Sequence, residues 1–118
     1  MGGAVAVVAA ARLHPAAVVD LSGERSTRGL TAGIAADAGA AAGKVTAPAL
    51  FAVAHDDRYI SVADIRLIER RARSHTKELV VLPAAAGHGW NMLVGTTTEW
   101  SPLAVHVAAF IRRAGRPR

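Results

Sequence analysis

The chain of 118 residues contains no cysteine, and only 4% of its residues are aromatic. The absence of cysteine excludes disulfide bonds, thiolate metal sites, iron–sulfur clusters and a cysteine nucleophile within these residues. Aromatic side chains are too few to stack on the bases of a bound nucleic acid. Acidic residues are also outnumbered, because 14 lysines and arginines against 9 aspartates and glutamates give a net charge of +5.

Apolar runs long enough for a membrane are lacking as well. Residues 1–11 form an almost unbroken run of small apolar side chains, but a span of the bilayer takes about 20 such residues. The run ends in Ala9-Ala10-Ala11, which resembles a signal-peptide cleavage site, yet it has no positively charged start. We therefore expect a cytoplasmic protein that has no membrane partner.

Hydrophobic residues make up 52% of the chain and charged residues 19%, which predicts a folded core in a single domain over residues 1–118. The excess positive charge is nearly all arginine. It gathers near two predicted helix ends, where cations complement the negative end of the helix dipole, so we expect no nucleic acid partner. These arginines are Arg70, Arg71 and Arg73, and then Arg112, Arg113, Arg116 and Arg118.

The apolar pattern predicts four helices that alternate with three strands. The strands, at residues 17–21, 49–54 and 78–82, are short continuous apolar runs, typical of strands buried on both faces. The first helix covers residues 3–13, which are apolar all round, so we expect it to be buried, and a second helix loosely covers residues 28–44. A third begins after Ser61 with an apolar stripe of Val62, Ile65, Ile68 and Ala72, and a fourth begins after Ser101 with a stripe of Leu103, Val107, Phe110, Ile111 and Ala114.

This order predicts an α/β fold in which a parallel sheet is flanked by helices in three layers. A sheet of three parallel strands has two open edges, and the first helix has no strand before it. The chain therefore looks like the later part of a larger sheet.

Polar side chains follow the second and third strands. His55, Asp56 and Asp57 come after the second strand, and His88 lies in Gly87-His88-Gly89-Trp90 after the third. Because the carboxyl ends of parallel strands meet at one edge of a sheet, an acid there can accept the proton of one imidazole nitrogen. The other nitrogen then acts as a base. Solvated loop residues and a metal site of His55, Asp56, Asp57 and His88 stay open as alternatives.

Three segments resemble the α/β-hydrolase family. Residues 48–61 are similar to the family's strand and "G-x-x-D" turn, with Ala54 in place of the glycine. Residues 77–90, which end in Gly-His-Gly-Trp, look like the last strand and its histidine loop. Met1-Gly2-Gly3 is similar to the residues after the nucleophile in a "G-x-S-M-G-G" elbow. The resemblance covers the whole chain and implies the C-terminal half of an α/β-hydrolase fold.

The resemblance also implies roles for individual residues. His88 would be the general base, and Asp57 the acid that orients it, with Asp56 as the second choice for that acid. The Met1 amide would donate to the oxyanion, and Trp90, Tyr59 and Met92 would bind the substrate at the rim of the pocket. The family's chemistry is acyl transfer without a cofactor, and its implied substrates here are small ester or acyl compounds.

The same resemblance places the nucleophilic serine immediately before Met1. Ser22 and Ser26 do not replace it, because neither lies in a strand–nucleophile–helix elbow. We therefore expect no turnover from the 118-residue chain alone. A start codon misassigned within a longer hydrolase gene is favoured over a true truncation. The alternative function is that of an inactive interaction or oligomerisation module, which associates as a homo-oligomer through an exposed sheet edge.

Overall fold

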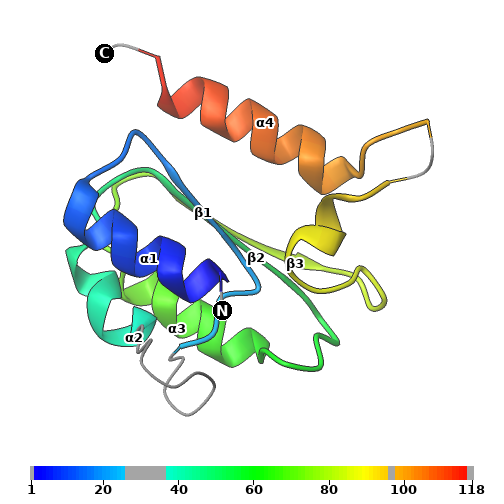
Figure 1. Ribbon diagram of the computed structural model, residues 1–118, viewed down its shortest axis with the longest axis horizontal. Coiled ribbons are helices and arrows are strands. Elements are labelled where there is room, and N and C mark those ends of the chain that lie inside the picture. Colours follow the sequence, from blue (N-terminus) through cyan, green and yellow to red (C-terminus); the bar gives the residue numbers. More distant parts are fainter. Residues whose placement is uncertain (1, 26–36, 96–97, 117–118) are drawn as a thin grey trace.

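The computed structural model describes residues 2–25, 37–95 and 98–116 (Figure 1). The described helices are α1 (Gly2–Leu13), α2 (Ala38–Ala41), α3 (Val62–Arg71) and α4 (Pro102–Ala114), with two short 3-10 helices, η1 (Ala42–Lys44) and η2 (Gly89–Leu93). The strands are β1 (Val18–Leu21), β2 (Ala49–Ala54) and β3 (Lys77–Leu82). Among the described residues, no helix combines the length and the apolar character that crossing a membrane requires.

The three strands form one parallel sheet in the order β1-β2-β3. Val18 of β1 is the partner of Ala49, and Ala49 is the partner of Lys77 in β3. Figure 1 shows α1, α2 and α3 on one face of this sheet and α4 on the other. The prediction of a helix-covered parallel sheet is therefore confirmed.

The core is divided by β2, whose six residues are all buried. Because side chains alternate along a strand, its odd-numbered residues pack with α1 and α3, and its even-numbered residues pack on the side of α4. The first set is Ala49, Phe51 and Val53. The second set is Leu50, Ala52 and Ala54, which join Met92, Leu103 and Phe110. The central strand thus holds both helical layers in place.

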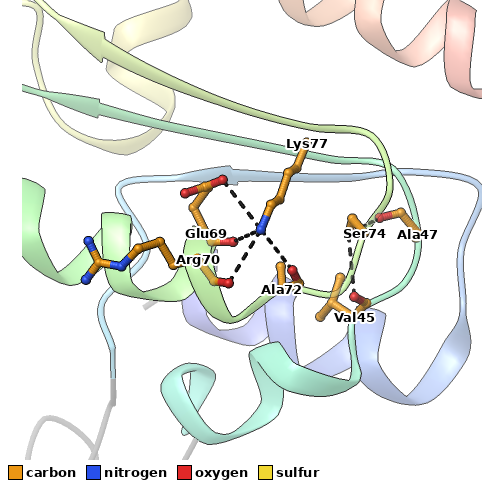
Figure 2. A network of polar contacts seen from close by, with 7 residues as sticks. All are labelled: Val45, Ala47, Glu69, Arg70, Ala72, Ser74 and Lys77. Carbon is orange, nitrogen blue, oxygen red and sulfur yellow. Dashed lines mark hydrogen bonds and ion pairs between the residues drawn. The ribbon is translucent and has the colours of Figure 1, made fainter.

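Helix α3 begins and ends at side chains that satisfy its terminal backbone groups. The Ser61 hydroxyl accepts the Asp64 amide proton at 3.1 Å, as a helix N-cap does. At the other end, the Lys77 ammonium group donates to the carbonyl oxygens of Glu69 at 2.8 Å and Ala72 at 3.0 Å (Figure 2). The first residue of β3 therefore closes the end of the helix that precedes it.

A serine in the loop between α3 and β3 holds a neighbouring segment. The Ser74 hydroxyl donates to the Ala47 carbonyl at 2.5 Å and lies 3.5 Å from the Val45 carbonyl (Figure 2). These contacts tie the loop before β2 to the loop before β3. Side-chain hydrogen bonds thus fasten the amino ends of β2 and β3, opposite the carboxyl ends where the candidate site lies.

Several expectations about single elements are wrong. Helix α1 is not buried all round, because it packs against the sheet on one side only, and Val5 and Leu13 are 43% and 76% exposed. Strand β3 is only half-buried, since it lies at the edge of the sheet. Ile111 of α4 is 49% exposed. Of the helix predicted over 28–44, residues 28–36 lie outside the described part of the chain, and the rest forms only α2 and η1.

Candidate active site

The carboxyl ends of β2 and β3 bring Asp57 and His88 together. Asp57 follows the last residue of β2 by three positions, and His88 follows the last residue of β3 by six. Because the two strands are parallel neighbours, their following loops meet at the same edge of the sheet. The Nδ1 atom of His88 lies 2.7 Å from Oδ2 of Asp57.

The Asp57 carboxylate is held from several directions. Its side chain is fully buried, and Oδ1 accepts the amide protons of Tyr59 at 2.9 Å and Ile60 at 3.1 Å. Burial raises the pKa of Asp57, but the hydrogen bonds from the Tyr59 amide, His88, Ser22 and the Ile60 amide outweigh it. The pKa therefore lies below its ordinary value, and the group stays ionised beside the imidazole.

The loop that carries His88 depends on two glycines. Gly87 has a φ of 103° and Gly89 a φ of 56°. Both values lie in the left-handed region, which residues other than glycine rarely adopt. The imidazole is 39% exposed. The Tyr59 ring lies edge-on to it at a centroid distance of 4.9 Å, so the imidazole is held between a carboxylate and an aromatic ring while part of it stays accessible.

A groove of about 400 Å³ lies beside His88. It runs between the N-terminus of α1 and the loop after β3, and Gly2, Gly3, Leu21, His88 and Trp90 are among its lining residues. The first amides of a helix have no partner within that helix. The groove therefore joins an imidazole, a helix N-terminus and apolar surface in a space that fits a small molecule.

A second hollow of about 290 Å³ lies beside the same pair of residues. Asp56, Tyr59 and Gly87 are among the residues that line it. Asp57 and His88 both line this hollow, whereas only His88 reaches the 400 Å³ groove. The imidazole thus lies between the two spaces, with its acid partner on the side of the smaller one.

The other residues singled out by sequence have different surroundings. The Asp56 carboxylate accepts the Ala85 amide proton at 2.9 and 3.0 Å, so it stabilises the turn after β3 rather than the imidazole. Met92 is buried in the core at 3% exposure, whereas Tyr59 and Trp90 are 78% and 70% exposed. Met1 lies outside the described residues.

The metal-site alternative finds no matching geometry in the part of the chain that the structure describes. His55 follows β2 directly and is exposed, and Asp56 and Asp57 use their carboxylates in the hydrogen bonds given above. No group of three or more histidine, aspartate or glutamate side chains among the described residues is arranged to hold a metal ion.

Sequence reasoning rejected Ser22 as a nucleophile and assigned no role to it or to Asp20, the two polar residues at the end of β1. Ser22 is 1% exposed, has a φ of 53° and accepts the Gly89 amide proton at 3.0 Å. Asp20 is fully buried within the strand. The available signal was an acid inside the apolar run Val18-Val19-Asp20-Leu21, followed at once by a serine and a glycine.

The Asp20 carboxyl group is buried against backbone. Gly3 and Gly23 approach it so closely that neither position has room for a Cβ atom. Neither oxygen has a hydrogen-bond partner among the described residues. Burial raises the pKa of Asp20 to about 7, and the nearby Gly23 amide, which makes no well-aligned hydrogen bond, offsets only part of the effect.

Comparisons of this chain with models of protein families, with curated proteins and with solved structures give no match.

Proposed function

We propose that this chain forms the acid–base part of a serine hydrolase that acts on small ester or acyl substrates, in the C-terminal half of an α/β-hydrolase fold. The observation that carries the proposal is the 2.7 Å contact between Nδ1 of His88 and Oδ2 of Asp57. It lies at the carboxyl ends of parallel strands, where open α/β sheets place their reactive groups. The resemblance of the sequence to the family supplies the reaction class.

In this proposal, the ionised Asp57 accepts the proton on Nδ1 of His88. The two backbone amides on Oδ1 hold the carboxylate in one orientation, and this fixed carboxylate orients the imidazole. This tautomer leaves Nε2 free to take a proton. His88 then removes the proton of a serine hydroxyl as it attacks the substrate carbonyl, and returns that proton to the leaving group.

The groove beside His88 is the proposed substrate site. Its volume of about 400 Å³ lies at the small end of the range for ligand sites, which favours short acyl groups. Gly2 and Gly3 at the start of α1 line it, and a helix N-terminus stabilises the negative charge that develops on a carbonyl oxygen. The nucleophile, by the resemblance, is a serine immediately before Met1.

Kinetics of ester hydrolysis test the proposal. The protein is produced together with the residues encoded in frame before Met1 and assayed with p-nitrophenyl acetate. Asp57→Asn and His88→Ala each lower kcat by about 10³-fold or more. Asp56→Asn is the matched control, because its amide oxygen still accepts the Ala85 amide proton, and it retains most of the activity. Equal losses in all three variants, or no hydrolysis by the wild type, would contradict the proposal.

The alternative, an interaction module, is favoured by one observation. Among the described residues, β1 pairs only with β2, so one edge of the sheet can accept a further strand. Folded assemblies of this chain that show no hydrolase activity with any in-frame extension would support the alternative.

A further inference from the structure

Ser22 occupies an unusual position at the end of β1. Its amide donates to the Ala52 carbonyl at 2.8 Å, which continues the hydrogen bonding between β1 and β2. Its φ of 53° lies in the left-handed region, where the backbone of residues other than glycine is strained. The chain therefore leaves the strand abruptly at this residue.

The turn brings the Ser22 hydroxyl to the loop that carries His88. The hydroxyl accepts the Gly89 amide proton at 3.0 Å, across 67 residues of sequence. Gly89 directly follows His88, so this hydrogen bond fixes the backbone one residue from the imidazole. The Met92 sulfur lies 4.0 Å from the same oxygen, so the hydroxyl contacts this part of the chain at two points.

The same side chain is coupled to the acid. Ser22 is among the groups whose hydrogen bonding stabilises the ionised form of Asp57 and lowers its pKa. Ser22 is also 1% exposed, so water does not compete for its hydroxyl. One buried side chain thus acts on the carboxylate and on the backbone next to the imidazole.

We propose that Ser22 is a positioning residue, whose hydroxyl holds the Gly89 amide and thereby keeps His88 in hydrogen-bond contact with Asp57. This role rests on the proposed function, since it concerns the same acid–base pair. It differs from the role of a nucleophile, because the hydroxyl is buried and engaged with the loop. A strained backbone at this position serves to aim the hydroxyl at that loop.

The test uses NMR on the 118-residue chain with Ser22→Gly and Ser22→Ala. Both variants lose the hydroxyl, but only glycine also relieves the positive φ. In the wild type, the Gly89 amide exchanges at least about tenfold more slowly than the amide of exposed Arg58, and His88 shows a slowly exchanging, strongly deshielded Nδ1 proton. In both variants, Gly89 exchange rises at least about tenfold and the Nδ1 resonance is lost.

Ser74→Ala is the matched control. Ser74 is also buried, and its hydroxyl donates to the Ala47 carbonyl at 2.5 Å, so its loss destabilises the chain near the amino ends of the strands, away from the His88 loop. This variant keeps the Nδ1 resonance. A merely structural role of Ser22 predicts that Ser22→Gly keeps it as well.

The outcomes separate the two proposals. A wild-type chain without the Nδ1 resonance overturns the proposed function together with the role of Ser22. If the wild type shows the resonance and either Ser22 variant retains it, the role of Ser22 alone is overturned. If neither variant folds, amide exchange in the wild type tests the role of Ser22. A Gly89 amide that exchanges as fast as the Arg58 amide overturns that role.

Discussion

Two aspartates near the carboxyl ends of neighbouring strands have buried side chains but different partners. Asp57 has two backbone amides and an imidazole on its oxygens, whereas Asp20 has no partner among the described residues. Hydrogen bonds to the charged form lower the pKa of Asp57, and burial without them raises the pKa of Asp20 to about 7. The charge of a buried acid therefore depends on the hydrogen-bond donors around it and not on burial alone.

The raised pKa of Asp20 predicts a pH-dependent stability. Between about pH 4 and pH 7, the unfolded chain loses the Asp20 proton while the folded chain keeps it. The folded state then binds more protons, so the free energy of unfolding falls as pH rises through this window and levels off above pH 7. The shift corresponds to a cost of up to about 4 kcal/mol at the upper end of the window.

Asp20→Asn tests this prediction by urea denaturation at several pH values. The variant lacks this fall in stability, so relative to the wild type it is stabilised progressively between about pH 4 and pH 7. Asp37→Asn is the control, since Asp37 caps α2 by accepting the Ala40 amide proton at 2.9 Å, and asparagine caps helices equally well. A wild-type pH profile that Asp20→Asn leaves unchanged would show that Asp20 is not the responsible group.

The contact between Asp57 and His88 was predictable from the sequence, because the topology of the sheet alone brings the two residues together. The positions of Asp57 and His88 after adjacent parallel strands place them near each other without knowledge of any side chain. The role of Ser22 was not predictable in this way, because it depends on a positive φ and on a hydrogen bond to a residue 67 positions away. Asp56 is also an aspartate next to Asp57, and only the structure shows that its carboxylate accepts the Ala85 amide proton instead.

At the scale of elements, the C-terminus of α3 depends on a residue of the next strand. Lys77 donates to the carbonyl oxygens of Glu69 and Ala72 and lies 3.6 Å from the Glu69 carboxylate. A cation at this end of a helix satisfies free carbonyl groups and complements the helix dipole. The ammonium group is therefore part of the helix end, although it belongs to β3.

Lys77→Met removes these hydrogen bonds and keeps most of the apolar stem. We expect the free energy of unfolding to fall by about 2 kcal/mol, as measured by thermal or urea denaturation. Lys44→Met is the matched control, because Lys44 is exposed at the end of η1 and its loss changes stability by less than about 0.5 kcal/mol. Equal effects of the two variants would show that the network in Figure 2 contributes nothing measurable.

Local signals predicted elements well where they coincide with a cap or with a continuous apolar run. Residues 49–54 were predicted with the bounds observed, and the helix after Ser61 with the start observed, because a buried run and an N-cap mark them. The apolar stripe predicted for this helix runs to Ala72, one residue past its observed end at Arg71. The degree of burial was predicted wrongly for α1, β3 and Ile111. It depends on how much of the rest of the molecule covers each face, and that information is not local to the element.

At the scale of the whole molecule, the open edge of β1 is the feature with the clearest consequence. The Val18 and Ser22 amides donate to Pro48 and Ala52 of the neighbouring segment. In a parallel ladder, the amides of the alternate residues, Val19 and Leu21, face the opposite edge. Among the described residues no strand pairs with that edge, and an unpaired edge favours association with another strand.

We therefore expect concentration-dependent association of the chain when it is studied alone. Val19→Pro removes a donor from the open edge and leaves the hydrogen bonds between β1 and β2 in place, so the apparent mass in sedimentation equilibrium falls to that of a monomer. Trp100→Ala is the control, because Trp100 is 76% exposed before α4, and it leaves the association unchanged. A wild-type monomer at every concentration would contradict this expectation.

The proposed hydrolase requires that Asp57 and His88 serve a serine nucleophile, and the most direct measurement is the sequence of the coding DNA before the Met1 codon. We expect an in-frame segment that encodes a strand-like apolar run ending in Gly-x-Ser immediately before Met1, as the nucleophile elbow requires. A stop codon in that frame, or an open frame without such a serine, would contradict the claim and favour the interaction module.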